Sequence, residues 1–331
     1  MCELRLVFFL LLLIIQCSAF GQQADTLIKK LDSLNKKADT TGQVNNIQPE
    51  AYNERTQITL KNYFVLLTSD FKQQISAPFT ISKNDWVKVA KYGAVLGGLF
   101  AVDKPVQKQA VKWRKDNPFL TNTSRYITNT GGMYEAIVLG AIGTYGYAFK
   151  KEKMKTTTLL ASQAYLTGIV LNTVVKKLAG RHRPSVYNQD RVDADPFVFK
   201  GPFSNSGKDA NGKKLAASFP SAHATLGFAA ATVYAMEYRD QPIVPILSYS
   251  AATLISLSRI TENAHWTSDV VTGALIGYLT GRQVVNNYHR YAKVKTTPKP
   301  TSKRTRKSNI SLNMRSIGGE TNPVLTFTLR P

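Results

Sequence analysis

The sequence predicts an all-α fold: a bundle of six helices, with a polar N-terminal leader before it and a small C-terminal β-hairpin after it. Six long apolar stretches, rich in Ala, Gly, Leu and Thr, occupy the middle of the chain. Each has the length of a helix of about 15 to 20 residues, and loops containing Pro, Asn, Asp and Gly separate them without strand-like alternation. Small residues at this density favour close helix packing. The stretches are 86–102, 132–149, 157–175, 223–236, 243–257 and 270–285.

The N-terminus has the pattern of an export signal. Arg5 precedes a continuous apolar run over residues 6–15, which is too short to span a bilayer. Ala19 and Gly21 supply the small residues that a signal peptidase requires, so we expect cleavage after Gly21. A lipoprotein acylated at Cys17 and an uncleaved anchor are the alternatives. The protein is therefore expected in the periplasm or cell envelope.

The remaining chain divides by composition. The segment before the apolar stretches is rich in Gln, Asn, Thr and Lys, and we expect a solvated leader there. Beyond the last stretch the chain is basic and rich in Pro, Thr and Ser, which is typical of a flexible linker. Short alternation around Gly318-Gly319 then predicts the hairpin. The predicted units are a signal peptide 1–21, a polar segment 22–80, a catalytic domain 81–288, a basic linker 289–308 and a β segment 309–331.

Composition limits the classes of function. The chain has 43 Lys and Arg against 21 Asp and Glu, a net charge of +22, which favours anionic partners. An exported protein is not expected to bind nucleic acid. Contact with an anionic membrane surface is the second interpretation of the basic tail, beside that of a flexible linker. Both cysteines lie within the first 17 residues. This position excludes disulfide scaffolds, cysteine-based zinc sites and thiol catalysis in the body of the protein.

A histidine and an aspartate mark the first candidate cluster. His265 and Asp269 are four residues apart, a spacing that places two side chains on one face of a helix. There Asp269 is expected to accept the Nδ1 proton of His265 and to leave Nε2 as a nucleophile. Arg259, at the end of the preceding helix, is expected to reach the same pocket.

Two further clusters supply anion-binding groups. Pro220-Ser221-Ala222-His223 opens a helix, whose first backbone N–H groups bind anions. The Ser221 hydroxyl adds a donor, and His223 is placed to protonate a leaving oxygen. Lys176 and Arg183 are seven residues apart, two turns of a helix that Pro184 is expected to end. Together with Arg259 these cations can surround one phosphoryl group. Of the other histidines, His182 is expected in a loop and His289 on the surface.

The three clusters together resemble the signature of the type 2 phosphatidic acid phosphatase superfamily. That superfamily also contains bacterial acid phosphatases, polyprenyl diphosphate phosphatases and vanadium haloperoxidases. The resemblance covers about residues 84–286 and implies a phosphohistidine intermediate on His265 with no metal or other cofactor. Ala222 and Asn263 stand where the family usually has Gly. The implied site residues are Lys176, Arg183, Ser221, His223, Arg259, His265 and Asp269.

The resulting hypothesis is a metal-independent phosphatase that hydrolyses a phosphomonoester or diphosphate, on a lipid or a small organic molecule. His265 attacks phosphorus, and His223 protonates the departing oxygen. One alternative is a haloperoxidase in which vanadate replaces phosphate. Another is a non-catalytic phosphate-binding protein of the envelope. Short helices rich in Thr, Gly and Tyr, with a mean hydropathy of −0.18, favour an exported bundle that is soluble or peripherally attached over one that spans the membrane.

Overall fold

The structure is a computed structural model of the chain. It describes residues 52, 56–79, 83–188, 190–203, 207–208, 212, 214–296, 308–317 and 320–329. For 78, 83–84, 128–136, 293–296 and the two strands it describes the backbone alone. The expected signal peptide, the acylation alternative at Cys17 and the basic stretch 297–307 lie outside these residues.

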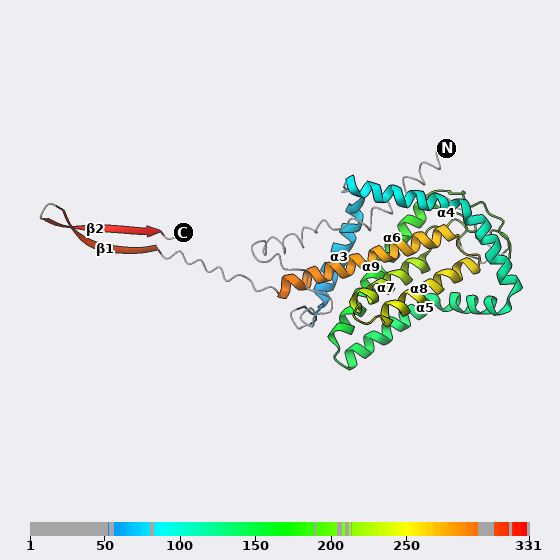
Figure 1. The fold of residues 1–331 in the computed structure, drawn as a ribbon, viewed down its shortest axis with the longest axis horizontal. Coiled ribbons are helices and arrows are strands. Elements are labelled where there is room, and N and C mark those ends of the chain that lie inside the picture. The colour runs from blue at the N-terminus through cyan, green and yellow to red at the C-terminus, as the bar shows by residue number, and fades with distance from the viewer. Residues whose placement is uncertain are drawn as a thin grey trace. The chain divides into compact units, whose positions relative to one another are not determined.

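The described part of the body is helical, as predicted (Figure 1). Each apolar stretch coincides with one helix, except that residue 149 follows a helix end, and polar residues extend most of these helices beyond the stretches. Pro105, for example, lies inside the longest helix and does not end it. The helices are α3 (Leu60–Ser76), α4 (Lys83–Asp116), α5 (Pro118–Ala148), α6 (Glu152–Ala179), α7 (Ala222–Glu237), α8 (Ile243–Thr261) and α9 (Thr267–Thr296), with a short 3-10 turn η2 (Ala77–Phe79) after α3.

Helix α7 forms the centre of the bundle, in contact with α6, α8 and α9. Its side chains are mostly small, and Ala224, Ala229 and Val233 are fully buried. One apolar core extends from α7 across Leu160 of α6 to Tyr288 of α9. Burial of α7 on several sides explains why its sequence is apolar over its whole length rather than along one stripe.

Three glycines of α9 bring its backbone against that of α7. A Cβ atom built on Gly273 would lie 2.5 Å from the Ser221 carbonyl oxygen, and one on Gly277 would lie 2.2 Å from that of Thr225. A Cβ on Gly281 would lie 2.5 Å from the Ala229 carbonyl oxygen. Contacts that ascend both helices in the same order show that α7 and α9 run parallel. Their N-termini therefore lie at the same end of the bundle.

Helix α3 lies within the segment that the sequence predicted as a solvated leader, yet it packs on α9. Asp70 is fully buried and accepts a hydrogen bond of 2.6 Å from Asn287 Nδ2. Gln283 Nε2 donates to the Asp70 carbonyl oxygen at 3.0 Å. Burial raises the pKa of Asp70 to about 7, because Asn287 offers only partial compensation. Polar contacts thus hold α3 to the bundle, which an apolar pattern cannot reveal.

The prediction that His289 lies on the surface is wrong. His289 is fully buried on α9, and its Nε2 atom lies 2.7 Å from a carboxylate oxygen of Glu237 at the end of α7. Tyr52 donates to the other oxygen of Glu237 at 2.6 Å. Helix α9 also continues to Thr296, so the first residues of the predicted linker are helical. The basic composition of this stretch concealed the buried face of the helix.

The described residues of the C-terminal unit are two strands. Strands β1 (Ser308–Ile317) and β2 (Glu320–Leu329) pair antiparallel, with Ser308 opposite Leu329 and Ile317 opposite Glu320.

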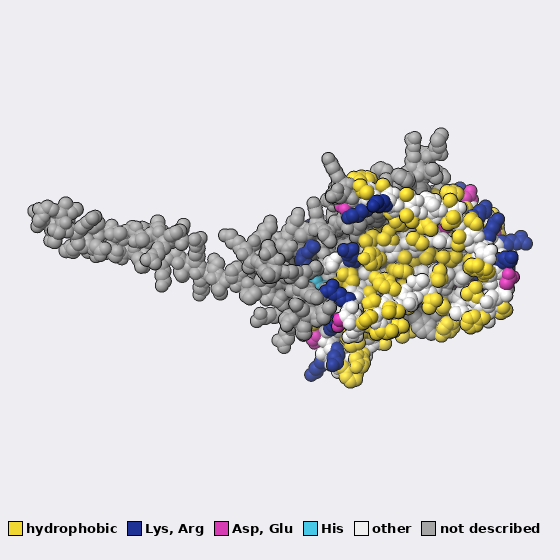
Figure 2. Space-filling view, in the orientation of Figure 1, with side chains coloured by type: hydrophobic (Ala, Val, Ile, Leu, Met, Phe, Trp, Pro, Cys, Tyr) yellow, Lys and Arg dark blue, Asp and Glu magenta, His cyan; other side chains and the backbone are white. Residues whose placement is uncertain are grey.

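The surface of the helical body carries many apolar side chains. Figure 2 shows hydrophobic groups over much of one face, with Lys and Arg side chains near its two ends. Exposed residues on α8 include Ile246, Leu247 and Leu254, each more than half exposed. Within the described residues, α6 and α8 are long and apolar enough to cross a membrane by length and composition.

Candidate active site

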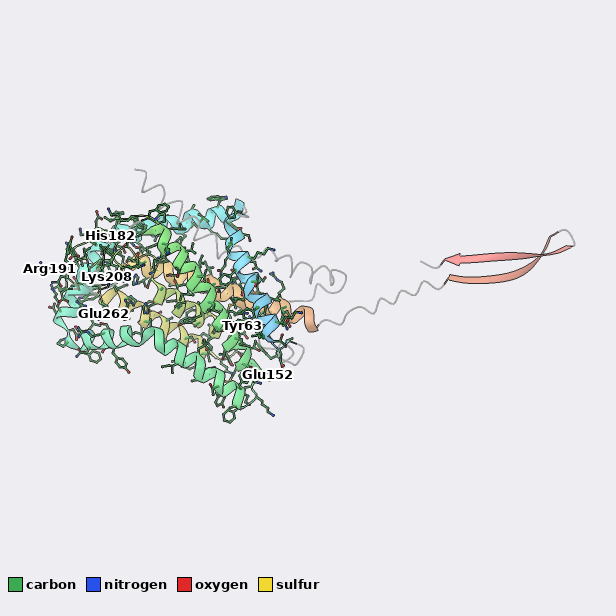
Figure 3. The ribbon with its side chains drawn as sticks, turned by 180° about the vertical axis from the view of Figure 1, so that it is seen from behind. Tyr63, Glu152, His182, Arg191, Lys208 and Glu262 are labelled. Carbon is green, nitrogen blue, oxygen red and sulfur yellow. The ribbon has the colours of Figure 1, made fainter. Side chains whose placement is uncertain are left out.

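The site forms where the N-termini of α7 and α9 meet. The Ser221 backbone N–H donates to the Asp269 carbonyl oxygen at 3.0 Å, which joins the two helix starts directly. Two helix N-termini at one point present several N–H groups without helical partners, and these favour an anion. The loop between α6 and α7 lies at this same end: Figure 3 shows His182, Arg191, Lys208 and Glu262 there, and Tyr63 and Glu152 at the other end.

The start of α7 has the form that the sequence predicted. Ser221 is the N-cap, and Ala222 and His223 are the first two helical residues. Ser221 is fully buried, but its hydroxyl makes no capping bond and has no hydrogen-bond partner in the structure. A buried hydroxyl without a partner costs free energy, unless a ligand binds it.

His265 lies in the turn before α9 and is 2% exposed. Its Nδ1 atom lies 2.7 Å from the backbone carbonyl oxygen of Ser218. Because a carbonyl oxygen can only accept, Nδ1 carries the proton, and Nε2 keeps a lone pair. Burial, together with the positive charges of Arg183 and Lys176, lowers the pKa of His265 well below its usual 6.5. His265 is therefore neutral at pH 7, in the tautomer that a nucleophile at Nε2 requires.

The predicted hydrogen bond from His265 to Asp269 is not present. The nearest carboxylate oxygen of Asp269 lies 3.6 Å from Nδ1. The spacing of four residues was read as one helical turn, but α9 begins only at Thr267, after His265. Asp269 instead accepts from the backbone N–H of Trp266 at 2.9 Å and from the Ser218 hydroxyl at 2.5 Å. The first of these bonds caps the start of α9.

Arg181 is the ionic partner of Asp269, and the sequence analysis missed it. Its Nη1 atom donates to Asp269 at 2.5 Å, and both side chains are completely buried. Burial alone would raise the pKa of Asp269, but the Arg181 charge and the Ser218 hydrogen bond contribute to lowering it to about 2. Arg181 was hidden among the basic residues of its cluster, where charge alone does not distinguish a buried cation from a solvated one.

The predicted phosphate-binding cations come from three different places. Lys176 lies in the last turn of α6, and its Nζ atom donates to the Ala217 carbonyl oxygen at 3.0 Å. The prediction that Arg183 lies on that same helix is wrong. Helix α6 ends at Ala179, and Gly180 caps it with φ of 57°. Arg183 instead lies in the following segment and donates to the Ala264 carbonyl oxygen at 2.8 Å.

Arg259 completes the set from the last turn of α8. It is 1% exposed, and neither its Nε nor its Nη1 atom has a hydrogen-bond partner in the structure. Burial, reinforced by the positive charge of Arg183 and opposed by the negative charge of Glu262, lowers the pKa of Arg259 to about 10. The Arg259 carbonyl oxygen accepts from the backbone N–H of His265 at 3.3 Å, so this cation adjoins the nucleophile in the fold. An anion is the natural partner for its unused donors.

Asn263 shapes the turn between Arg259 and His265. Its φ is 53°, in the left-handed region that Asn tolerates better than most residues. Its side chain accepts from Gln107 of α4 at 2.9 Å and donates to the Arg191 carbonyl oxygen at 2.7 Å. Asn263 therefore supplies the backbone conformation expected of Gly at this position. In addition, it links the turn to α4 and to the loop between α6 and α7.

His182 lies in the loop, as predicted, and its carbonyl oxygen accepts from Trp266 Nε1 at 2.9 Å. Burial and the charge of Lys200 lower the pKa of its imidazole.

Within the part of the chain that the structure describes, His, Cys, Asp and Glu side chains do not gather in any group of three or more that can hold a metal ion.

Comparisons with known proteins point to one family. Residues 157–292 match the family model described as PAP2 superfamily. A stretch of 95 residues is 37% identical to the lipid A 1-phosphatase of Porphyromonas gingivalis, and it covers 27% of this chain and 21% of that protein. The match thus spans about a fifth of the relative's length. A solved structure of a transmembrane PAP2-type phosphatidylglycerolphosphate phosphatase from Bacillus subtilis aligns with a TM-score of 0.40 and 20% identity, over 56% of this chain and 83% of that one.

Proposed function

Residues 157–292 belong to the PAP2 superfamily, and on that premise we propose that this chain is a phosphatase that removes phosphate from a phosphorylated lipid through a phosphohistidine intermediate. The observation that carries the proposal is the state of His265. It is buried, neutral and held with its proton on Nδ1, beside a buried arginine whose Nε and Nη1 donors have no partner. This combination suits attack on a phosphoryl group.

The proposed reaction has two steps. First, His265 Nε2 forms a bond to phosphorus, the ester P–O bond breaks, and His223 gives its proton to the departing oxygen. Second, His223 takes a proton from water, whose oxygen attacks phosphorus and releases His265 and inorganic phosphate. Lys176, Arg183 and Arg259 hold the phosphoryl oxygens, together with the N–H groups at the start of α7 and the Ser221 hydroxyl.

A lipid substrate at a membrane fits the surface of the body. Exposed apolar side chains on α6 and α8, such as Val170 and Leu247, offer contact with lipid. The matched relative acts on lipid A, which is a phosphorylated lipid. We therefore propose membrane association in the cell envelope, in agreement with the predicted export signal, and no metal or other cofactor.

The proposal is tested on the full-length protein in detergent. Phosphate release is measured from lipid A, phosphatidic acid, phosphatidylglycerolphosphate, a polyprenyl diphosphate and a soluble aryl phosphate. Wild type is expected to hydrolyse at least one lipid substrate faster than the aryl phosphate, and EDTA is expected to leave the rate unchanged. A rate that EDTA abolishes and a divalent cation restores contradicts the mechanism.

Replacement of single histidines identifies the nucleophile. His265→Gln is expected to abolish turnover and the acid-labile ³²P label that wild type retains on the protein. His289→Gln is the matched control, because it removes an equally buried histidine at the far end of α9. It is expected to retain turnover per folded molecule. Turnover by His265→Gln near the wild-type rate refutes the proposed chemistry.

A further inference from the structure

A second buried ion pair lies directly behind the candidate nucleophile. Arg181 Nη2 donates to a carboxylate oxygen of Asp103 at 2.7 Å, and both side chains are fully buried. Asp103 belongs to α4, outside residues 157–292 that match the family model. Helix α4 therefore contributes an acidic group to the site from a separate part of the chain.

Ser268 links this pair to the start of α9. Its backbone N–H and its hydroxyl both donate to Asp103, at 2.9 Å and 2.5 Å, and the hydroxyl accepts from Arg181 at 2.6 Å. Asp103 thus receives three hydrogen bonds, which suits an ionised carboxylate that acts only as an acceptor. Burial raises the pKa of Asp103, and the Arg181 charge and the Ser268 hydrogen bond oppose that rise. Burial of a charge at this depth is favourable only with such partners.

Aromatic rings hold the guanidinium in place. Its central carbon lies 4.6 Å from the Phe100 ring centre, 5.2 Å from that of Phe199 and 5.5 Å from that of Trp266. The Nε atom donates to the Pro196 carbonyl oxygen at 2.9 Å. The two carboxylates and three rings around Arg181 hold its guanidinium in place. The Asp269 carboxylate that it binds is held with it.

We propose that Asp103 and Arg181 are positioning residues for Asp269. Together the three side chains form a buried unit of net charge −1, which stabilises the positive charge that His265 gains when it binds phosphorus. This inference rests on the proposed function. When Nε2 forms its bond to phosphorus, the ring retains the Nδ1 proton and becomes cationic. The Ser218 carbonyl oxygen accepts a hydrogen bond from that N–H, and Asp269 stays ionised at 3.6 Å from Nδ1. Arg181 alone would cancel the Asp269 charge, and Asp103 restores the negative balance.

Asp103→Asn tests the charge with little change of shape. We expect kcat to fall by about 10- to 100-fold, as is usual when an outer carboxylate partner is removed, while KM changes little. The rate of phosphoenzyme formation in a single turnover is expected to fall by the same factor. Glu237→Gln is the matched control, because it removes a fully buried carboxylate paired with His289, far from the site. It is expected to lower the melting temperature and leave kcat per folded molecule unchanged.

The pH profile of Arg181→Gln distinguishes a positioning role from a merely structural one. Without the guanidinium the pKa of Asp269 is expected to rise, so the pH below which kcat falls is expected to move upward relative to wild type and Glu237→Gln. Should Asp103→Asn not fold, Ser268→Ala keeps both charges and removes the hydroxyl that joins them, with an expected fall in kcat of several-fold.

The possible results separate the two proposals. Wild type without phosphatase activity overturns the proposed function. An active wild type, with Asp103→Asn or its substitute Ser268→Ala at the wild-type kcat, overturns only this inference. An unshifted pH profile in Arg181→Gln, or an equal loss of kcat in Glu237→Gln, also overturns it.

Discussion

The backbone carbonyl oxygen of Ser218 lies 2.7 Å from Nδ1 of His265 and determines which ring nitrogen carries the proton. Asp269, at 3.6 Å, acts on the ring through its charge. The orientation of the candidate nucleophile therefore depends on the main chain just before α7, which no substitution of a side chain removes directly.

Asp269→Asn is expected to lower kcat by about 10²- to 10³-fold, the scale of one lost electrostatic partner. The loss is expected to be smaller than the roughly 10⁴-fold of an enzyme whose carboxylate also sets the histidine tautomer. The tautomer here is maintained by Ser218. Steady-state kinetics and ¹⁵N NMR of the imidazoles measure both quantities, and a change of the His265 tautomer in the variant contradicts this explanation.

Ser221→Ala and Arg259→Met are expected to change stability and function in opposite directions. Each removes a buried polar group that has unpartnered atoms, so the melting temperature is expected to rise. The affinity for inorganic vanadate, a phosphate analogue, is expected to fall by about tenfold or more, the scale of hydrogen bonds to a charged group. Thermal unfolding and inhibition constants test this pair. Tighter vanadate binding in either variant contradicts the placement of the phosphate.

Gly277→Ala is expected to destabilise the fold by about 1–3 kcal/mol, because the new Cβ meets the Thr225 carbonyl oxygen. Gly98→Ala is the control, since nothing lies within 4 Å of a Cβ at that helical position. It is expected to stabilise by about 0.5–1 kcal/mol through helix propensity. Denaturant unfolding compares the two variants. Equal stabilisation by both shows that α7 and α9 are not in backbone contact.

Substitutions at Ala222 test the cradle at the start of α7. Gly is expected to be tolerated or to raise activity, because the backbone N–H remains and a methyl group beside the phosphate is removed. Val is expected to be much worse, because its branched side chain crowds a substrate oxygen. Values of kcat/KM for Gly, Ala, Ser and Val are expected to follow side-chain volume. If Val equals Ala, residue 222 does not lie at the phosphate.

The pH dependence follows from the lowered pKa of His265. The candidate nucleophile is neutral above that pKa. Protonation of His265 is therefore not expected to lower kcat/KM until the pH is well below 6.5. The unfolded chain binds a proton at about pH 6.5 that the folded chain refuses, so His265 lowers stability as pH falls below that value. Lys176→Met removes a positive charge that lowers the pKa, and its acid limb is expected to lie at higher pH than in wild type. An acid limb at lower pH contradicts the assignment.

The helical segments could be predicted from the sequence because their cause is local. Apolar runs of sufficient length and the residues that break them define where α4 to α9 lie, and the Ser221 cap with its preceding proline defines where α7 begins. The candidate site residues could also be named from the sequence, because the proposed nucleophile, acid and cations stand in short clusters. Helix α3 was missed because its buried face is largely polar, as the buried side chains of Asp70 and Gln73 show.

The partners of those residues were decided only by the tertiary structure. The four-residue step from His265 to Asp269 indicated a direct hydrogen bond, but a helix that begins at Thr267 gives the two residues different surroundings. Asp103 and Arg181 are 78 residues apart and meet only because α4 packs against the start of α9. A sequence does not distinguish a charged side chain that is buried from one that is solvated. Packing determines which of them lose water, and those must find partners wherever the fold provides them.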